Sequence, residues 1–368
     1  MEKFAFIIHP LDVKDVARKF PFTRYLPERV VENAFRLLPP VKVSHISGVR
    51  TPHGEAEGWF VACPLTARQM LALPREFVLQ RIIQAGKVAE KLGAGVVGLG
   101  AFTSVVGDAG ITVAKNLNIA VTTGNSYTVA TAIEGTRQAA RLMGYDLRRI
   151  HVVVLGATGS IGKVCARLLA GDVGKMTLVA RDRSRLESVA SQILYESGLA
   201  VRVTSDVKQA VRTAEVVIAV TSAVDTIIGP EDLMPGAVVC DVSRPRNVSR
   251  QVAEQRDDVL VIEGGVVEVP GPVEFNFNFG FPPRTAYACM SETMLLALEG
   301  RYENFSLGRD ITIRQVTEIS ALAKKHGFKL AGFRSFERAV QPEEIARIKA
   351  RASRRQEALK AELPRVAP

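Results

Sequence analysis

The sequence has few of the residues that bind metals or form disulfides. Four cysteines and five histidines occur among 368 residues, and the cysteines form no C-x-x-C pair. No histidine lies near a cysteine at a spacing typical of zinc ligands, so we expect neither a disulfide framework nor a metal site. A G-x-S-x-G motif is absent as well, which removes the local signature of a serine hydrolase.

Long apolar runs, internal repeats and low-complexity segments are also missing. No run approaches the roughly 20 apolar residues that span a bilayer, and the apolar stretch near the N-terminus is too short for a signal peptide. A cytoplasmic location is therefore expected. The hydrophobic content of 47% is still ample for the cores of two or three domains.

Negative charge is in the minority, because 48 Lys and Arg face 38 Asp and Glu, for a net charge of +10. This excess points to an acidic partner, which could be nucleic acid, an anionic membrane surface, a phosphorylated cofactor or an acidic carrier protein. Part of the excess lies in residues 336–368. Their helical pattern has little apolar face, so we interpret them as a solvated basic tail.

Strand-like and helix-like runs alternate through most of the chain, which indicates an α/β protein. Residues 1–145 are predicted to form an N-terminal α/β substrate domain. Residues 146–265 hold six apolar strand candidates separated by helices, the pattern of a Rossmann-type, doubly wound parallel sheet. Residues 266–335 are predicted to be a mostly helical region that carries an aromatic loop and Cys289.

A G-x-x-G-x-x-G motif follows the first strand of the second domain and opens a helix. Glycines at this spacing let the backbone turn tightly and approach a pyrophosphate, whose charge then meets the amides of the helix start. The predicted cofactor-binding residues of this turn are Gly156, Thr158, Gly159, Ser160, Ile161 and Gly162. The alternative is a plain strand-to-helix turn.

The second strand of this domain is followed by arginines. Arg181 and Arg183 flank Asp182, and guanidinium groups at this point suit the 2′-phosphate of NADPH. We therefore predict NADPH as the cofactor. The alternative is that the arginines are exposed residues at the start of a helix that has Asp182 as its N-cap. Thr221 and Ser222 follow the fourth strand and are predicted near the nicotinamide, unless they form an ordinary polar loop.

Cys289 is the candidate nucleophile. Two prolines precede its helix, Thr285 is a candidate cap, and both the helix dipole and nearby Arg284 favour a thiolate. The alternative is a cysteine that packs as a small hydrophobe, as we expect for Cys165 and Cys240, whereas Cys63 is ambiguous. An activated thiol beside a dinucleotide fold indicates thioester or thiohemiacetal chemistry coupled to hydride transfer.

Over about residues 1–335 the sequence resembles the long-chain acyl-(acyl carrier protein) reductases of cyanobacteria. The resemblance is carried by segments 98–106, 122–128, 156–162, 263–268, 286–300, 304–313 and 324–328. It implies NADPH-dependent reduction of a long-chain acyl thioester to a fatty aldehyde, with the acyl group carried on Cys289. The sequence departs from the family at Tyr127, where a histidine is expected, and after residue 335.

The reaction needs hydrogen-bond donors for an oxyanion. Gly124, Asn125 and Ser126 follow a strand and open a helix, so we predict Asn125 and Ser126 as catalytic donors; the alternative is a simple N-cap. His9, at the end of the first strand, is either a proton donor or a structural histidine. His326 is interpreted as a cation at a helix C-terminus.

The resemblance implies that the partner is a thioester of acyl carrier protein or coenzyme A, with no nucleic acid and at most peripheral membrane contact; an oligomer is left open. Residues 221–248 also resemble the cofactor domains of glutamyl-tRNA reductases and shikimate dehydrogenases. Glutamyl-tRNA reductases form their thioester in the N-terminal domain, where Cys63 is the only cysteine here. A third alternative is a non-enzymatic NADP(H)-sensing redox protein.

Overall fold

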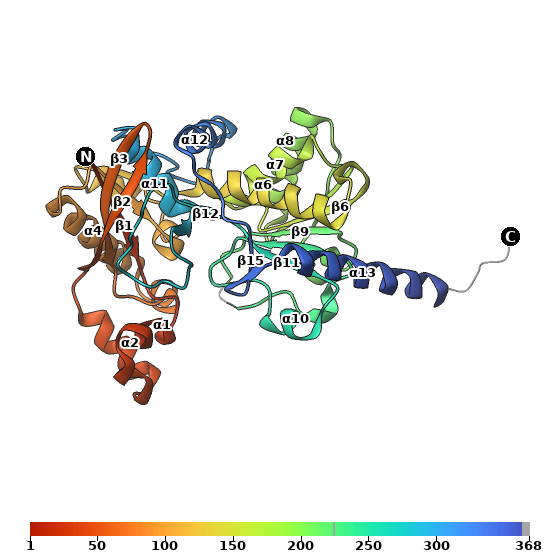
Figure 1. Cartoon of the computed structure of the whole chain (residues 1–368), viewed down its shortest axis with the longest axis horizontal. Coiled ribbons are helices and arrows are strands. Elements are labelled where there is room, and N and C mark those ends of the chain that lie inside the picture. The colour runs from red at the N-terminus through yellow and green to blue at the C-terminus, as the bar shows by residue number, and fades with distance from the viewer. Residues whose placement is uncertain (224, 363–368) are drawn as a thin grey trace. The chain divides into compact units, whose positions relative to one another are not determined.

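The computed structural model describes residues 1–223 and 225–362, and the chain divides into two compact units (Figure 1). Unit 1 comprises Met1–Thr128 and Val267–Ala331, and unit 2 comprises Val129–Val266 and Gly332–Pro368. These bounds differ from the predicted segments. The region that carries Cys289 belongs to the compact unit of the N-terminal domain, and the C-terminal segment belongs to that of the Rossmann-type sheet.

Unit 1 is built on a five-stranded mixed sheet of order β2-β3-β1-β4-β5. Its strands are β1 (Glu2–Ile8), β2 (Val41–Thr51), β3 (Gly54–Ala62), β4 (Val96–Leu99) and β5 (Ala120–Thr122). Strand β1 pairs in parallel with β3 and β4, and β2 is antiparallel to β3. The central strands are apolar runs that helices cover, which confirms the α/β character predicted from the sequence.

Helices α3 (Ala67–Ala72), α4 (Arg75–Lys91), α5 (Ile111–Lys115), α11 (Ala288–Leu298) and α12 (Ile313–His326) belong to unit 1. Helix α6 (Asn125–Met143) begins in unit 1 and continues in unit 2. Helix α11 packs on β1, β3 and β4. Three short strands form a small second sheet: β12 (Val266–Glu268), β13 (Thr285–Tyr287) and β14 (Lys329–Leu330). Strands β12 and β13 precede α11 in sequence, and β14 follows α12.

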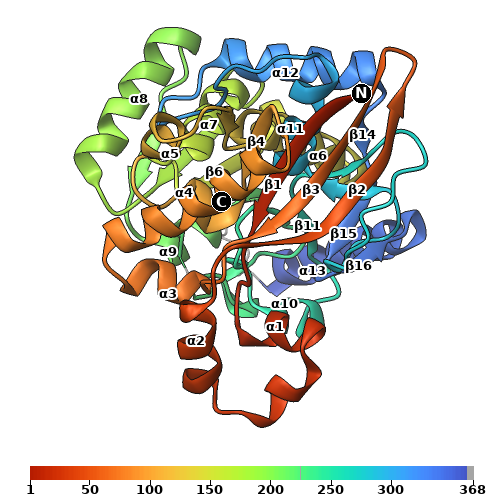
Figure 2. The same cartoon turned by 90° about the vertical axis from the view of Figure 1, so that its left-hand side faces the viewer.

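A helical lobe is inserted between β1 and β2. It consists of α1 (Val13–Lys19), the 3₁₀ helix η1 (Pro21–Tyr25) and α2 (Glu28–Leu37). In both views this lobe extends beyond the edge of the unit 1 sheet (Figures 1 and 2). No helix among the described residues has the length and apolarity that crossing a membrane requires.

Unit 2 contains a six-stranded parallel sheet of order β11-β10-β9-β6-β7-β8. The strands are β6 (His151–Leu155), β7 (Lys175–Val179), β8 (Arg202–Thr204), β9 (Val216–Ala219), β10 (Val238–Asp241) and β11 (Leu260–Glu263). Numbered along the chain, this order is that of the doubly wound dinucleotide-binding fold, with its reversal between β6 and β9. The predicted Rossmann-type sheet is confirmed.

Helices α7 (Ser160–Ala170), α8 (Arg183–Ser197), α9 (Val207–Val211) and α10 (Arg250–Gln255) connect the strands of unit 2. The C-terminal segment adds a hairpin of β15 (Phe333–Ser335) and β16 (Arg338–Val340), followed by helix α13 (Pro342–Glu362). Figure 1 shows α13 beside the strands β11 and β15.

Helix α13 is not the solvated tail that its composition suggests. Its Ile345 and Ala352 are buried at positions i and i+7, and Arg355 pairs with the buried carboxylate of Asp258 at 2.8 Å. The prediction of a solvated tail was wrong because two buried apolar residues and one buried ion-pair partner are enough to hold a highly charged helix on the unit.

Candidate functional site

Cys289 is the second residue of α11, in the first turn of the helix. Every other residue of α11 is buried, whereas Cys289 is partly exposed. Tyr287 is the N-cap, and Thr285 lies in strand β13, so the predicted cap at Thr285 is corrected. The helix therefore begins later than its prolines suggest, and the thiol lies closer to the helix N-terminus than the sequence indicates. Backbone N–H groups in a first turn have no intrahelical partner, which favours negative charge there.

The other three cysteines are buried thiols. Burial raises the pKa of Cys63 to about 12 and that of Cys240 to about 12, and it raises the pKa of Cys165 further. Each lies at 0% exposure. A thiol that cannot ionise at neutral pH is a poor nucleophile, so Cys289 is the cysteine whose surroundings suit covalent chemistry.

The turn before α6 lies directly against Cys289. Gly124 has φ +72°, and a Cβ on this residue would fall 2.3 Å from both Cα and Cβ of Cys289. Only glycine fits, because any side chain would collide with the cysteine and the backbone conformation is unfavourable for other residues. The structure thus brings together segments 122–128 and 286–300, two of those that carry the sequence resemblance.

A buried carboxylate, which the sequence analysis missed, joins the two segments. Glu292 lies one helical turn after Cys289 and accepts hydrogen bonds from the Thr122 hydroxyl and from the Tyr127 N–H, the latter at 2.7 Å. Burial raises the pKa of the Glu292 carboxyl, against the hydrogen bonds that it accepts. Its partners lie about 170 positions away in sequence, so only an unusual glutamate inside an apolar helix could have signalled it.

The structure places the two predicted oxyanion donors differently. Ser126 is fully buried, its N–H donates to the Ser306 hydroxyl at 3.3 Å, and the two hydroxyls are 2.6 Å apart. Asn125 is 8% exposed and is the first residue of α6. Ser126 is therefore engaged with Ser306 and holds the turn, and the donor role of Asn125 stays a prediction.

The two predicted histidine roles have separate outcomes. His9 accepts the N–H of Phe102 at 3.1 Å through Nε2, and its Nδ1 lies 3.0 Å from the carbonyl oxygen of Pro10. Burial lowers its pKa to about 4. These contacts suit a neutral structural histidine, the second of the two interpretations. His326 ends α12, as expected, and is buried between Thr51 and Glu299.

The glycine turn of unit 2 has the close backbone approach that a dinucleotide site needs. A Cβ at Gly156 (φ +80°) would fall 2.6 Å from the carbonyl oxygen of Val220, and one at Gly162 would fall 2.3 Å from that of Gly156. Gly159 is the exposed N-cap of α7, ahead of Ser160 and Ile161, which are the first residues of the helix. The backbone amides at this helix start are the donors that a pyrophosphate would accept.

The arginines after β7 point in different directions. Asp182 is the N-cap of α8, and its side chain accepts the N–H of Arg185 at 3.1 Å. Arg183 pairs along the helix with Glu187 at 2.9 Å. Arg185, which was not among the predicted site residues, donates to the carbonyl oxygen of Thr158 at 3.0 Å.

This geometry changes the selection of phosphate-binding arginines. Arg181 is exposed directly after the strand, and the guanidinium of Arg185 lies at the glycine turn. Because the Asp182 carboxylate caps α8, it is engaged away from the role that an acidic residue has in NAD sites. Arg183 is engaged with Glu187, so Arg181 and Arg185 remain as the candidates for a 2′-phosphate.

Thr221 lies at the point where the strand order reverses. It follows β9, and its Cα would lie 3.2 Å from a Cβ on Gly156. The N–H and hydroxyl of Thr221 donate to Asn247 Oδ1 at 3.2 and 2.9 Å, so the loop after β10 holds this residue. Ser222 is exposed. Ligands of open α/β sheets bind at this switch point, and the position of both residues near the nicotinamide stays a prediction.

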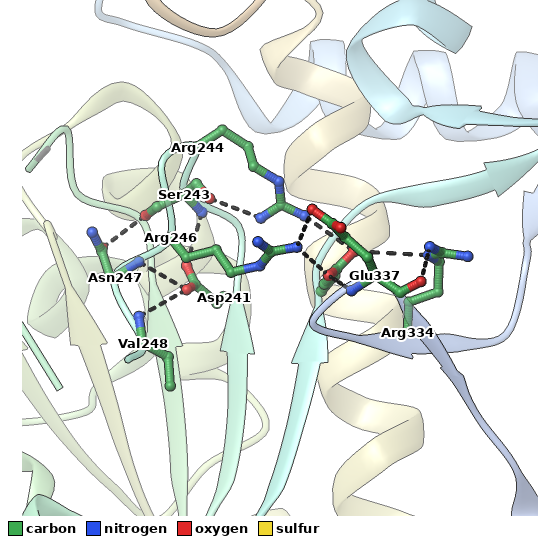
Figure 3. Close-up of polar contacts among 9 residues, drawn as sticks. Asp241, Ser243, Arg244, Arg246, Asn247, Val248, Arg334 and Glu337 are labelled. Carbon is green, nitrogen blue, oxygen red and sulfur yellow. Dashed lines mark hydrogen bonds and ion pairs between the residues drawn. The ribbon is translucent and has the colours of Figure 1, made fainter. Parts of the chain in front are cut away.

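A cluster of arginines surrounds the buried carboxylate of Glu263 at the end of β11. Figure 3 shows Arg244 and Arg246 from the loop after β10, and Arg334 from β15, directed toward one place. The guanidinium of Arg246 lies 2.7 Å from Oε1 of Glu263, and the same oxygen accepts the N–H of Glu337 at 2.8 Å. Burial opposes ionisation, but the arginines hold the pKa of Glu263 below its usual value. The cluster ties the C-terminal hairpin to the sheet edge.

Comparison with known proteins finds similarity to several dehydrogenases and reductases. Residues 137–263 match the family model described as Shikimate / quinate 5-dehydrogenase. The chain is 27% identical over 331 residues to the long-chain acyl-[acyl-carrier-protein] reductase of Synechococcus elongatus. This aligned stretch covers 86% of this chain and 94% of that protein. A 142-residue stretch is 29% identical to glutamyl-tRNA reductase of Roseiflexus sp., over 36% of this chain and 31% of that protein.

A further relative has a different name and a much longer chain. The aminotransferase PigE of Serratia sp. is 33% identical over 297 residues, which is 80% of this chain but 34% of that protein. The chain therefore spans about a third of the length of this relative. Together with the switch-point geometry, the matches support an NAD(P)-dependent oxidoreductase whose unit 2 is a nicotinamide-dinucleotide-binding domain, consistent with the predicted NADPH.

Proposed function

We propose that this protein reduces long-chain acyl thioesters to fatty aldehydes with NADPH, through an acyl-enzyme on Cys289. The observation that carries the proposal is the position of Cys289, the partly exposed residue in the first turn of an otherwise buried helix, against a turn that only glycine can form. The similarity to an acyl-[acyl-carrier-protein] reductase over most of both chains supports it.

In this proposal the Cys289 thiolate attacks the carbonyl carbon of the acyl thioester. The carbonyl oxygen becomes an oxyanion, the carrier thiolate leaves, and the acyl group remains on Sγ as a new thioester. The N–H groups at the start of α11 and the Asn125 side chain are the assigned donors to the oxyanion. Glu292 positions the turn, because it binds both Thr122 and the Tyr127 N–H.

The residues of unit 2 fit NADPH. Gly156 and Gly162 would allow the close approach, the amides around Gly159 would hold the pyrophosphate, and Arg181 and Arg185 would hold the 2′-phosphate. When bound, the cofactor supplies the hydride that reduces the acyl-cysteine. Release of the aldehyde then requires the Cys289 sulfur to leave as thiolate, which the first turn of α11 again stabilises.

The carrier in this proposal is acyl carrier protein or coenzyme A. Both would present an acyl thioester with negative charge nearby, which suits a chain of net charge +10. The alternative in which a thioester forms in the N-terminal region has little support. Cys63 is fully buried, and burial raises its pKa to about 12.

The test is intact mass spectrometry after incubation with a long-chain acyl thioester in the absence of NADPH. The mass should rise by one acyl group, the rise should be absent in Cys289→Ala, and Cys63→Ala should label like the wild type. Addition of NADPH should then release an aldehyde and restore the unlabelled mass. A label that survives in Cys289→Ala would refute the proposal, and labelling without aldehyde release would favour a thiol-based sensor.

A further inference from the structure

The helical lobe of unit 1 exposes an unusual amount of apolar surface. Of the 17 large hydrophobic side chains exposed among the described residues, eight lie between positions 20 and 41. Tyr25 is 90% exposed and Leu37 is 79% exposed. The eight are Phe20, Phe22, Tyr25, Leu26, Val30, Leu37, Leu38 and Val41. A concentration of this kind marks an interaction surface rather than the scattered apolar residues of an ordinary surface.

Helix α2 shows how this surface is built. Val31 is buried, and the ring of Phe35, one turn later, contacts that of Phe20 at 6.2 Å, so these residues form the inner face of the helix. Val30 and Leu37, separated by two turns, form a second apolar stripe, which is exposed. The inner face carries these packing contacts, whereas the outer stripe faces solvent.

Basic side chains surround this outer stripe. Arg29 and Arg36 are exposed on the flank of the stripe, two turns apart, and Arg24 lies beside Tyr25 in η1. Among the side chains that the structure describes between residues 11 and 42, the exposed charged ones are five bases and two acids: Lys14, Arg24, Arg29, Arg36 and Lys42 against Asp12 and Glu28. An apolar stripe with a basic flank is the pattern of helices that lie in a membrane interface.

The lobe presents this surface in a fixed orientation on unit 1. The Thr66 hydroxyl donates to the Glu32 carboxylate at 3.0 Å, and Gln69 donates to the Glu32 carbonyl oxygen at 2.9 Å. Arg81 donates to the carbonyl oxygen of Arg36. These bonds join α2 to α3 and α4, so the outer stripe is held outward rather than folded back.

We propose that the helical lobe binds the surface of a bilayer that contains anionic lipids. The outer stripe of α2 and the tip at Tyr25 would enter the headgroup region, and Arg24 and Arg29 would pair with lipid phosphates. The complementarity of charge commits the surface to an anionic bilayer, since a bilayer of neutral lipids has no net negative surface charge to attract the basic flank. The inference does not depend on the proposed function, because binding requires neither cofactor nor thioester.

The test is co-sedimentation of the full chain with vesicles of phosphatidylcholine alone or mixed with phosphatidylglycerol. The protein should bind the mixed vesicles and be released by salt. The double variant Tyr25→Ser/Leu37→Ser should lose at least about tenfold in affinity. Its matched control is Leu194→Ser/Tyr195→Ser, which removes a comparably exposed pair from unit 2 and should bind as the wild type does. Replacement of Arg24 and Arg29 by glutamine should weaken binding roughly fivefold per charge.

A second measurement locates the contact. Tyr25→Trp should shift its fluorescence to shorter wavelength on mixed vesicles, whereas the native Trp59 is buried in β3 and should contribute a constant signal. Equal binding to neutral and mixed vesicles, an equal loss in the two double variants, or binding with no shift at position 25 would each overturn the proposal. The proposal would also be overturned if the wild type failed to bind the mixed vesicles. In that case, a loss of affinity for an acidic carrier protein in the lobe variants would show that the lobe binds that protein instead of a bilayer.

Discussion

Gly124 and Cys289 are in such close contact that a Cβ on the glycine would lie 2.3 Å from both Cα and Cβ of the cysteine. The two residues are far apart in sequence. Gly124 lies in the turn before α6, and Cys289 lies in the first turn of α11. Glu292 strengthens this contact, because its carboxylate on α11 accepts the N–H of Tyr127 on α6. The candidate nucleophile is therefore positioned by a helix start that faces it.

The first prediction follows from this contact. Gly124→Ala should unfold more easily than the wild type and acylate more slowly, because the turn must move away from Cys289. Overpacking of this kind costs about 1–3 kcal/mol. Thermal unfolding and the rate of acyl-enzyme formation would measure the two effects.

Gly198→Ala is the matched control. Gly198 has φ +75°, close to the φ +72° of Gly124, but a Cβ there meets nothing within 4 Å. The control should show the cost of the left-handed backbone alone and leave acylation unchanged. Equal destabilisation in the two variants, with an unchanged acylation rate in both, would contradict the proposed role of the contact.

The second prediction concerns the reactivity of the four thiols. Iodoacetamide should add one carbamidomethyl group to the native protein near neutral pH, at Cys289. Burial raises the pKa of Cys63 and Cys240 to about 12, so these thiols should react once the protein unfolds. Intact mass and peptide mapping would check this, with Cys289→Ala as the unreactive control. Rapid modification of that variant would show that another cysteine is accessible.

Features that depend on neighbours in sequence were predictable. The glycine turn, the alternation of apolar strands and helices, and the strand-end position of Thr221 follow from local patterns, and the strand order confirms the fold that these patterns predict. We expected segment 122–128 near Cys289 because of the family resemblance and because the reaction needs oxyanion donors. No local pattern in the sequence indicated the contact itself.

Features that depend on distant partners were not predictable. In the sequence, Glu292 is a single glutamate in an apolar helix, and its role becomes visible only with its hydrogen-bond partners Thr122 and Tyr127. The sequence does not distinguish Arg185 from the neighbouring arginines. The structure does, because Arg185 donates a hydrogen bond to the carbonyl oxygen of Thr158. Helix α13 reads as solvated because its anchor, Asp258, lies on a different segment. In each case the missing information is a pairing across the fold rather than a property of the residue.

The third prediction separates the arginines of unit 2. Arg181→Ala and Arg185→Ala should each raise KM for NADPH by roughly ten- to a hundredfold and leave KM for NADH nearly unchanged, since each loses a charge-assisted bond to the 2′-phosphate. Arg183→Ala should have a smaller effect, because its guanidinium is already paired with Glu187. Steady-state kinetics with both cofactors would measure this. A parallel loss with NADH would indicate damage to the glycine turn instead of a lost phosphate contact.

The last prediction is a pH dependence of stability that arises at His9. Burial lowers its pKa from 6.5 to about 4, so between these values the unfolded chain binds a proton that the folded chain does not. Protonation then favours the unfolded state, and stability is lost as the pH falls from about 6.5 toward 4. By pH 4.5 the loss from this residue should be roughly 2–3 kcal/mol.

His9→Gln provides the comparison, because glutamine offers an acceptor for the Phe102 N–H and does not titrate. Urea unfolding can be followed through Trp59, which is buried in β3, the strand paired with the β1 strand that precedes His9. Between pH 7 and pH 4.5 the variant should lose roughly 2 kcal/mol less than the wild type, since the carboxylates titrate alike in both proteins. The same pH slope in the two proteins would mean that His9 is protonated in the folded state, and it would return this residue to the candidates for a proton donor.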